Sequence, residues 1–366
     1  MKLSMGIVGL PNVGKSTLFS ALTKHQVPAE NYPFCTIDPA VGVVPVPDNR
    51  LYQLAELSQS EETIPAVVEF VDIAGLVKGA AEGEGLGNQF LSNIREVNAI
   101  VQVVRFFENP DITHVSGDVS PRNDMETINL ELMLADIEQV RKRREKIERE
   151  VKRDHKEAIE EDNALVRVEQ ALHEGTPVRA LTLTEDEYPY VRQLQLLTHK
   201  PMLYALNIQS GGHNLHEAQD ERHDAAMEYI SQQGASYVIV DADTEKQLND
   251  VADEDRQSFR QELGAIDDGL GELIRQSYHT LGLITYFTTG PKETRAWTIV
   301  AGSTAPRAGA AIHSDFETKF IRAEVVAWND LLAAESYAKA RDQGKVRTEG
   351  KEYIVADGDV INFLHS

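Results

Sequence analysis

The residues that point to chemistry begin with a lysine and a serine near the N-terminus. Residues 9–17 read GLPNVGKST, so a glycine, four residues and a second glycine precede Lys15 and Ser16. This is the phosphate-binding loop pattern: glycines let backbone N–H groups surround a polyphosphate, the lysine reaches its outer phosphates and the hydroxyl binds Mg²⁺. The predicted phosphate-binding residues are Asn12, Val13, Gly14, Lys15, Ser16 and Thr17.

Three further residues fit the metal-binding and catalytic needs of such a site. Thr36 lies in a proline-marked stretch where nucleotide switches place a threonine that binds Mg²⁺ and senses the terminal phosphate. Asp72 and Gly75 form an Asp-x-x-Gly step after an apolar run, suited to hold Mg²⁺ through water and to approach that phosphate. We predict catalytic roles for Lys15, Thr36 and Gly75, and Mg²⁺ contacts from Ser16, Thr36 and, through water, Asp72.

The next position predicts slow turnover. Leu76 follows Gly75, where many switch GTPases carry a glutamine that orients the attacking water. A leucine side chain has no polar group for that task. The sequence therefore identifies no residue that positions the water.

A second motif concerns the base of the nucleotide. Residues 207–210 read Asn-Ile-Gln-Ser, where GTP-specific switches have Asn-Lys-x-Asp. Ser210 replaces the aspartate that accepts hydrogen bonds from guanine, and such matching is what gives steep discrimination. Asn207 and Ile208 remain as the predicted contacts to a purine. We expect adenine to be accepted at least as well as guanine.

Short apolar runs and helical patterns must position these side chains. A strand over 3–8 precedes the phosphate loop and a helix over 16–24 follows it. Further buried strands are predicted over 66–71, 99–104, 201–206 and 237–240. The order predicts an α/β fold.

From Asp124 the pattern becomes helical. Apolar residues recur at three- and four-residue steps, which predicts an antiparallel helical pair or short coiled coil. They are Leu130, Met133, Ile137, Val140, Ile147 and Val151, with further helical stretches over 163–173 and 187–197. The basic run 141–144 leaves two interpretations open: a solvated hairpin, or a surface that binds a partner.

The C-terminal part, from Leu281, is predicted to be a separate small domain. Residues 295–300, 320–326, 353–356 and 360–364 read as short strands, with a turn at 357–358. No catalytic constellation is evident in it. It suits a binding or regulatory module.

Composition limits the class of protein. The 366 residues, 42% apolar and 26% charged, suffice for two or three domains of an ordinary soluble protein. A net charge of −23 argues against binding nucleic acid with the whole surface, so an RNA partner requires a local basic patch. Without a membrane-length run or signal-like segment, and with Cys35 as the single cysteine, we expect a cytoplasmic protein that contacts no membrane. Cys35 is either a redox handle or a small buried side chain.

These motifs together resemble those of the Obg-like ATPases, in the YchF subfamily. The matching stretches are GIVGLPNVGKSTLF, NYPFCTIDP, FVDIAGLVKGA, EGLGNQFL, ITHVSG, RAWTIVAGSTAP, FIRAEVV and KEYIVADGDV. The resemblance implies a Ras-like P-loop domain over 1–280 with a coiled-coil arm inserted at about 125–199, and an α+β TGS domain of β-grasp type over 281–366. Members often have glutamate where this chain has Ser210, and some have a histidine where residues 80–82 read Ala-Ala-Glu.

The resemblance also implies an activity and partners. It implies Mg²⁺-dependent hydrolysis of ATP, with GTP accepted in some members, and association with the ribosome, either its large subunit or the 70S particle. Asn12 to Thr17 would hold the phosphates, Ser16 and Thr36 the Mg²⁺, and Asn207 and Ile208 the adenine. RNA contact would come through the arm or the TGS domain, and we expect a monomer.

Four functions remain open at this point. The first is a slow ATPase switch that presents its nucleotide state to the ribosome, and the second is an Obg-type GTPase acting in translation or ribosome assembly. The third is a phosphotransferase, and the fourth is a scaffold whose nucleotide is structural. Thr36 together with Asp72 and Gly75 favours a switch, because they sense a phosphate without an evident acceptor pocket.

Overall fold

The computed structural model describes residues 3–24, 40–73, 86–114, 117–218, 220–252, 255–263 and 268–365. The chain divides into two units, residues 1–42 with 69–276 and residues 43–68 with 277–366. Within the described ranges, no helix is long and apolar enough to cross a membrane.

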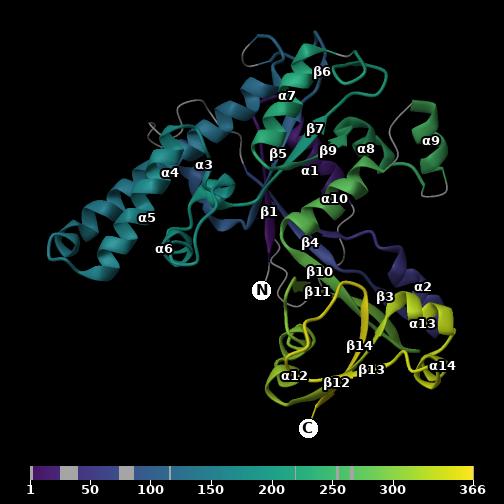
Figure 1. Ribbon diagram of the computed structural model, residues 1–366. Helices are drawn as coiled ribbons and strands as arrows, with labels where there is room; N and C mark the ends of the chain where they lie inside the picture. Colours follow the sequence, from purple (N-terminus) through teal and green to yellow (C-terminus); the bar gives the residue numbers. More distant parts are fainter. Residues whose placement is uncertain are drawn as a thin grey trace. The chain divides into compact units, whose positions relative to one another are not determined.

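A six-stranded sheet organises the first unit, in the order β2-β4-β1-β5-β7-β9 (Figure 1). Its strands are β1 (Ser4–Val8), β2 (Val41–Pro45), β4 (Val67–Asp72), β5 (Ala99–Arg105), β7 (Met202–Asn207) and β9 (Ser236–Val240). β1 pairs in parallel with β4 and β5, β5 with β7, and β7 with β9. These strands are mostly buried, as expected of parallel strands with both faces covered. Since parallel strands end at one edge, the residues that follow them gather there.

Helices cover this sheet. They are α1 (Lys15–Thr23), α3 (Leu86–Glu96), α7 (Glu221–Gln232), α8 (Ala242–Leu248) and α10 (Gly269–Thr280), while α9 (Arg256–Leu263) packs against α8. α1 packs beside α8, and α7 packs beside α4, the first helix of the arm. Two short strands, β6 (Phe107–Glu108) and β8 (His213–Asn214), pair antiparallel at the edge where β5 and β7 end.

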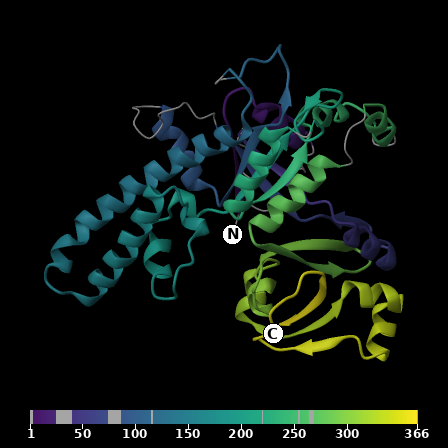
Figure 2. The same ribbon diagram turned by 45° about the horizontal axis from the view of Figure 1, so that its top comes forward.

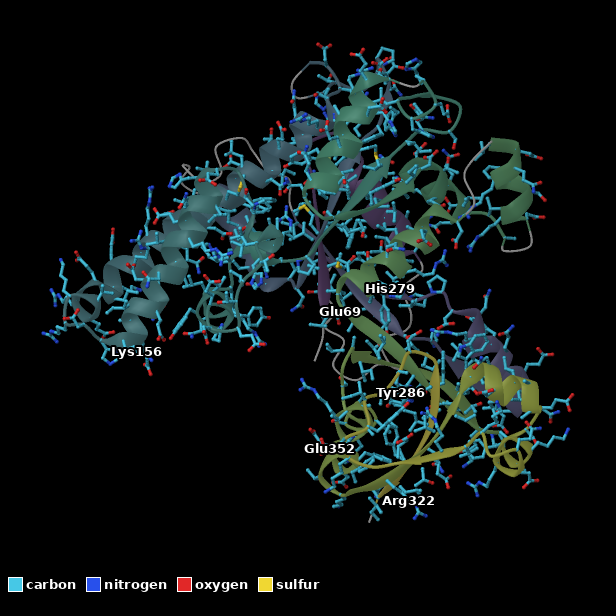
Figure 3. The ribbon with its side chains drawn as sticks, in the orientation of Figure 1. Glu69, Lys156, His279, Tyr286, Arg322 and Glu352 are labelled. Carbon is cyan, nitrogen blue, oxygen red and sulfur yellow. The ribbon has the colours of Figure 1, made fainter. Side chains whose placement is uncertain are left out.

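The arm is a helical hairpin of α4 (Pro121–Val151) and α5 (Lys156–His173), with Lys156 at its turn (Figure 3). The predicted helical pair is present, and α6 (Tyr188–Gln193) with two 3₁₀ turns, Val178–Ala180 and Leu197–His199, packs against it. Its core joins Met133, Ile137 and Val140 of α4 to Leu165, Val168 and Leu172 of α5.

One residue of the predicted seam lies elsewhere. Leu130 is 52% exposed, whereas Ile128 and Leu132 are fully buried. α4 contacts β5 and α7 as well as α5, and Asp124 and Asn129 near its start accept from Gln102 of β5 and donate to Tyr229 of α7, respectively. The seam begins only at Met133, because the heptad pattern does not tell which neighbour a helix face meets.

The second unit also contains a six-stranded sheet, in the order β13-β12-β14-β10-β11-β3 (Figure 2). Its strands are β3 (Glu62–Ile64), β10 (Leu283–Thr289), β11 (Glu293–Val300), β12 (Phe320–Ala327), β13 (Arg347–Glu349) and β14 (Asp359–His365). Its helices are α2 (Asn49–Ser58), α11 (Ala305–Gly309), α12 (Ser314–Thr318), α13 (Trp328–Ala334) and α14 (Tyr337–Asp342). The core gathers around Tyr286, labelled in Figure 3, whose ring contacts Trp297 and Phe363.

Two features of this unit differ from the sequence analysis. Residues 353–356 form no strand; only an isolated bridge joins Ile354 to Thr304. Residues 43–68, assigned from sequence to the nucleotide-binding domain, pack with the C-terminal residues instead. β3 pairs in parallel with β11, and the Arg50 guanidinium of α2 lies 2.6 Å from Asp357. Sequence separation hid this packing, because no local pattern marks a distant partner.

Candidate functional site

The phosphate loop turns from β1 into α1 through two residues with left-handed backbone. Asn12 has φ 63° and Gly14 has φ 102°. Such turns direct successive N–H groups to one side and form an anion-binding concavity. Within the described part of the chain, no side chain caps the N-terminus of α1, so its first N–H groups are available to an anion. The loop therefore has the geometry of a phosphate site.

Lys15 and Asp72 are the charged pair at this edge of the sheet. Lys15 is buried and donates from Nζ to the carbonyls of Gly9 and Leu10, both at 2.9 Å. Burial lowers the pKa of Lys15, an effect partly offset by the charge of Asp72. Burial likewise raises the pKa of Asp72, partly offset by Lys15. Each charge thus stabilises the ionised form of the other. A bound phosphate would place further negative charge near the Lys15 ammonium and stabilise it more.

Ser16 and Asp72 carry oxygen atoms of the kind that Mg²⁺ takes as ligands. Ser16 is exposed at the second residue of α1, and Asp72 ends β4 opposite Ile7 of β1, the strand that leads into the loop. Mg²⁺ in nucleotide sites takes one or two protein oxygens and completes its shell with phosphates and water. Among the described residues, no three His, Cys, Asp or Glu side chains form an all-protein metal cluster. The arrangement suits a metal that arrives with a nucleotide.

Asn207 holds three segments together. Its Nδ2 donates to the carbonyl of Val13 at 2.9 Å, and its Oδ1 accepts from the N–H of Ala242 at 3.0 Å. A Cβ added at Gly14 would lie 2.3 Å from the same Nδ2. From the sequence, Asn207 is predicted to contact the purine. The structure gives its amide a positioning role as well.

A cavity of about 420 Å³ opens along the phosphate loop and the ends of β5, β7 and β9. This size is typical of ligand pockets. It brings together most of the predicted binding residues, whereas Val13 is buried and contributes its backbone. The cavity is lined by Asn12, Gly14, Lys15, Ser16, Thr17, Phe107, Ile112, Asn207, Ile208, Gln209, Ala242 and Asp243.

Arg105, which was not predicted from the sequence, supports the wall of this cavity that Phe107 and Ile112 form. It ends β5 with 1% exposure and donates to the carbonyls of Phe107, Asn109 and Ile112, each at 3.0 Å. Its guanidinium also lies over the Phe107 ring, 4.8 Å from the centroid. Burial lowers the pKa of Arg105, with Asp124 and Glu108 partly offsetting this. The signal was an arginine at the end of an apolar strand, because arginine is almost never buried without partners.

Some predicted residues lie outside the described part of the chain. They are Thr36, Gly75, Leu76 and Cys35, with residues 80–82 of the glycine-rich loop. Their assigned roles stay predictions.

The basic run of the arm binds the arm's own acids. Arg143 donates to both oxygens of Glu161 at 2.7 and 2.9 Å. Arg144 donates to Asp162 and Glu169, and Arg141 donates to Glu169, at 2.7 to 2.8 Å. The arginines thus link α4 to α5, which favours the interpretation of a solvated hairpin over that of a free basic surface.

The fold and the site define a P-loop α/β nucleotide-binding protein of the GTPase type. Residues 4–207 match the family model described as 50S ribosome-binding GTPase. Residues 283–366 match the model of the YchF GTPase C-terminal domain, described as a protein of unknown function (DUF933).

Full-length relatives define the family more closely, and the chain belongs to the YchF family. It is 50% identical over 363 residues, 99% of both chains, to the ribosome-binding ATPase YchF of Bacillus subtilis. It is 48% identical to the protein of the same name from Escherichia coli O157:H7, over all of this chain and 99% of the relative. The solved structure of the Schizosaccharomyces pombe YchF GTPase is similar, with a TM-score of 0.87, 36% identity and coverage of 99% and 98%.

Proposed function

We propose that this protein is a Mg²⁺-dependent nucleotide-switch ATPase that associates with the ribosome. The observation that carries the proposal is the cavity along the phosphate loop. At its base end, the end near β7 and β9 that is proposed to hold the purine, Ile208 stands where the guanine-binding motif has a lysine, and Ser210 replaces the aspartate that reads guanine. The curated relatives of Bacillus subtilis and Escherichia coli bear the name ribosome-binding ATPase. Both lines of support point to ATP as the substrate.

In this proposal, the loop residues from Asn12 to Thr17 hold the phosphates with backbone N–H groups and the Lys15 ammonium. Ser16 and Thr36 hold Mg²⁺ directly, and Asp72 holds it through water. The metal, when bound, neutralises charge on the phosphates. Thr36 and Gly75 sense the terminal phosphate, and turnover is slow because Leu76 offers no group to orient water.

The base end suits adenine. Phe107, Ile112 and Ile208 give the cavity apolar walls that pack on either purine. The amide of Asn207 bonds to the backbone of Val13 and Ala242. The choice between adenine and guanine therefore depends on the other polar groups near the base. Because Ser210 carries no carboxylate, the strong guanine contact of GTP-specific switches is missing.

For the partners, we propose that the arm or the C-terminal unit contacts the ribosome, with RNA among its contacts. The C-terminal unit is proposed to be a TGS domain of β-grasp type. The nucleotide-binding domain is proposed to be drawn from residues 1–280, without residues 43–68, which pack with the C-terminal unit, and with the arm inserted at about 125–199. We further propose a cytoplasmic monomer.

A single set of measurements tests this function. Titration calorimetry with Mg²⁺ and non-hydrolysable ATP or GTP analogues gives the two affinities, and phosphate release gives turnover. Co-sedimentation with ribosomes, with the ATP analogue and with ADP, shows whether the partner reads the nucleotide state. Equal co-sedimentation in both states would exclude a ribosome-directed switch.

The alternative, an Obg-type GTPase, is favoured by one observation. The exposed carboxylate of Asp243 lines the base end and would accept hydrogen bonds from guanine. The solved Schizosaccharomyces pombe relative is also called a GTPase. If GTP binds far more tightly than ATP, and Asp243→Asn removes only the GTP affinity, the alternative replaces the first proposal.

A further inference from the structure

Two turns meet at the base end of the cavity, 207–210 after β7 and 241–244 after β9. The N–H of Ile208 donates to the carbonyl of Val240 at 2.9 Å. The N–H of Ser210 donates to Oδ2 of Asp241 at 2.6 Å. The turn that replaces the guanine-reading motif is therefore fastened directly to Asp241.

The Asp241 carboxylate is enclosed and fully engaged. It is 3% exposed and accepts from the N–H of Thr244 at 3.0 Å and from its hydroxyl at 2.8 Å, in addition to Ser210. It is also the N-cap of α8. Three donors fix its position, so it contributes negative charge at one defined point beside Ser210.

Ser210 is partly buried, and the group that contacts Asp241 is its backbone N–H. Its Oγ is buried and finds no hydrogen-bond partner among the described residues. Because the N–H of Ser210 binds Oδ2 of Asp241, a carboxylate on the side chain of residue 210 would lie within a few ångströms of that of Asp241. Two carboxylates that share a site disfavour each other's charge.

We propose that Asp241 is a specificity-determining residue that prevents position 210 from reading guanine with a carboxylate. The choice of base then belongs to the pair of residues 210 and 241, not to position 210 alone. Replacing Ser210 by aspartate is consequently insufficient to create a GTP-preferring protein. This inference rests on the proposed function, since it assumes that the cavity binds a purine nucleotide.

The test is a double-mutant cycle on the full-length protein, with ADP and GDP as probes that are not hydrolysed. Calorimetry compares wild type, Ser210→Asp, Asp241→Ser and the double variant. We expect Ser210→Asp alone to weaken the binding of both nucleotides and to change the ratio of GDP to ADP affinity by less than about threefold. The double variant should raise that ratio by about tenfold or more, because the effects of substitutions at residues in contact are not additive. A shift by Ser210→Asp as large as that of the double variant would overturn the proposal.

Two further variants separate charge from shape. Serine at position 241 remains a good N-cap, and Asp220→Ser, at the N-cap of α7, is the matched control for the loss of a capping aspartate. Ser210→Asp with Asp241→Asn keeps the size and removes the charge. Rescue of GDP binding by this pair supports the charge argument, and failure of both double variants to rescue contradicts it.

Folding is followed by thermal unfolding of each variant. If Ser210→Asp fails to fold, Ser210→Asn decides: a folded asparagine variant supports charge repulsion, and an unfolded one overturns it in favour of steric exclusion. The double-mutant cycle can fail or succeed independently of the proposed function. A wild type that prefers GDP would refute the adenine preference, whereas the non-additivity of positions 210 and 241 is read independently.

Discussion

Asn207 donates a hydrogen bond to the carbonyl of Val13 at 2.9 Å, across 194 positions of sequence. Through this bond, the strand end that faces the base supports the loop that surrounds the phosphates. The shape of the phosphate loop therefore depends on β7 as well as on its own glycines.

The first prediction concerns that bond. Asn207→Ala is expected to weaken ADP and GDP alike, because the loop loses a support rather than a base contact. The free energy of unfolding should fall by about 1–3 kcal/mol, the range for leaving a buried partner unsatisfied. Calorimetry and urea unfolding measure both, with the exposed Asn362→Ala as control. A variant that loses ADP binding but keeps GDP binding would show that Asn207 instead reads adenine.

The second prediction concerns Gly14. Gly14→Ala combines a left-handed φ of 102° with a Cβ only 2.3 Å from Asn207 Nδ2. Gly117→Ala is the matched control, since Gly117 has φ 90° but nothing within 4 Å of an added Cβ. Both variants should lose about 1–2 kcal/mol of stability from backbone strain, whereas Gly14→Ala alone should abolish nucleotide binding. Equal nucleotide affinities in the two variants would contradict the clash.

The third prediction separates stability from activity at Lys15. Lys15→Met removes a buried charge but keeps the length and apolar stem of the side chain. We expect the nucleotide-free protein to lose about 1–3 kcal/mol of stability, because Asp72 and two carbonyls lose a partner. Phosphate release should fall by at least about a hundredfold, as for loss of electrostatic stabilisation of a transition state. Urea unfolding and phosphate release measure the two effects. Unchanged turnover would support a structural nucleotide instead.

The fourth prediction assigns Arg105 a positioning role. Arg105→Lys keeps the charge but cannot donate to three carbonyls at once, so the wall formed by Phe107 and Ile112 should loosen. KM for ATP should rise by about tenfold with kcat within about twofold, the pattern for lost uniform binding. Arg122→Gln, on an exposed pair with Glu126, is the control. A fall in kcat at unchanged KM would contradict a role in the wall alone.

The fifth prediction concerns the arm. Burial raises the pKa of Glu169, but hydrogen bonds from Arg141 and Arg144 outweigh it, so the pKa lies below the usual 4.5. This contribution to stability is complete above pH 4.5 and is lost as the pH falls through the lower folded-state value. Arg144→Gln should make α5 open more easily by about 1 kcal/mol at pH 7, and the effect should shrink at low pH.

Hydrogen exchange of the α5 amides at pH 7 and pH 4 measures that opening. Lys152→Gln, which removes only an exposed pair with Glu148, is the matched control. An equal effect of both variants would show that the pairs between α4 and α5 do not hold the arm. Neutralising residues 141–144 is consequently an unsuitable test of RNA binding, because it loosens the hairpin.

Local patterns in the sequence determined much of the first unit. The phosphate loop, the buried strands around it and the helical arm follow from glycine spacing and apolar periodicity, which act over a few residues. The departures from Asn-Lys-x-Asp at Ile208 and Ser210 could also be predicted from the sequence, because each residue occupies a defined position of that motif.

Only the tertiary structure decided the remainder. Arg105 has three carbonyl partners, Leu130 faces away from the helical seam, and residues 43–68 join the C-terminal unit. The contact between Ser210 and Asp241 arises because β7 and β9 are neighbours whose ends meet at one edge of the sheet. Pairing of distant segments depends on which faces are buried together, and no run of adjacent residues encodes that choice.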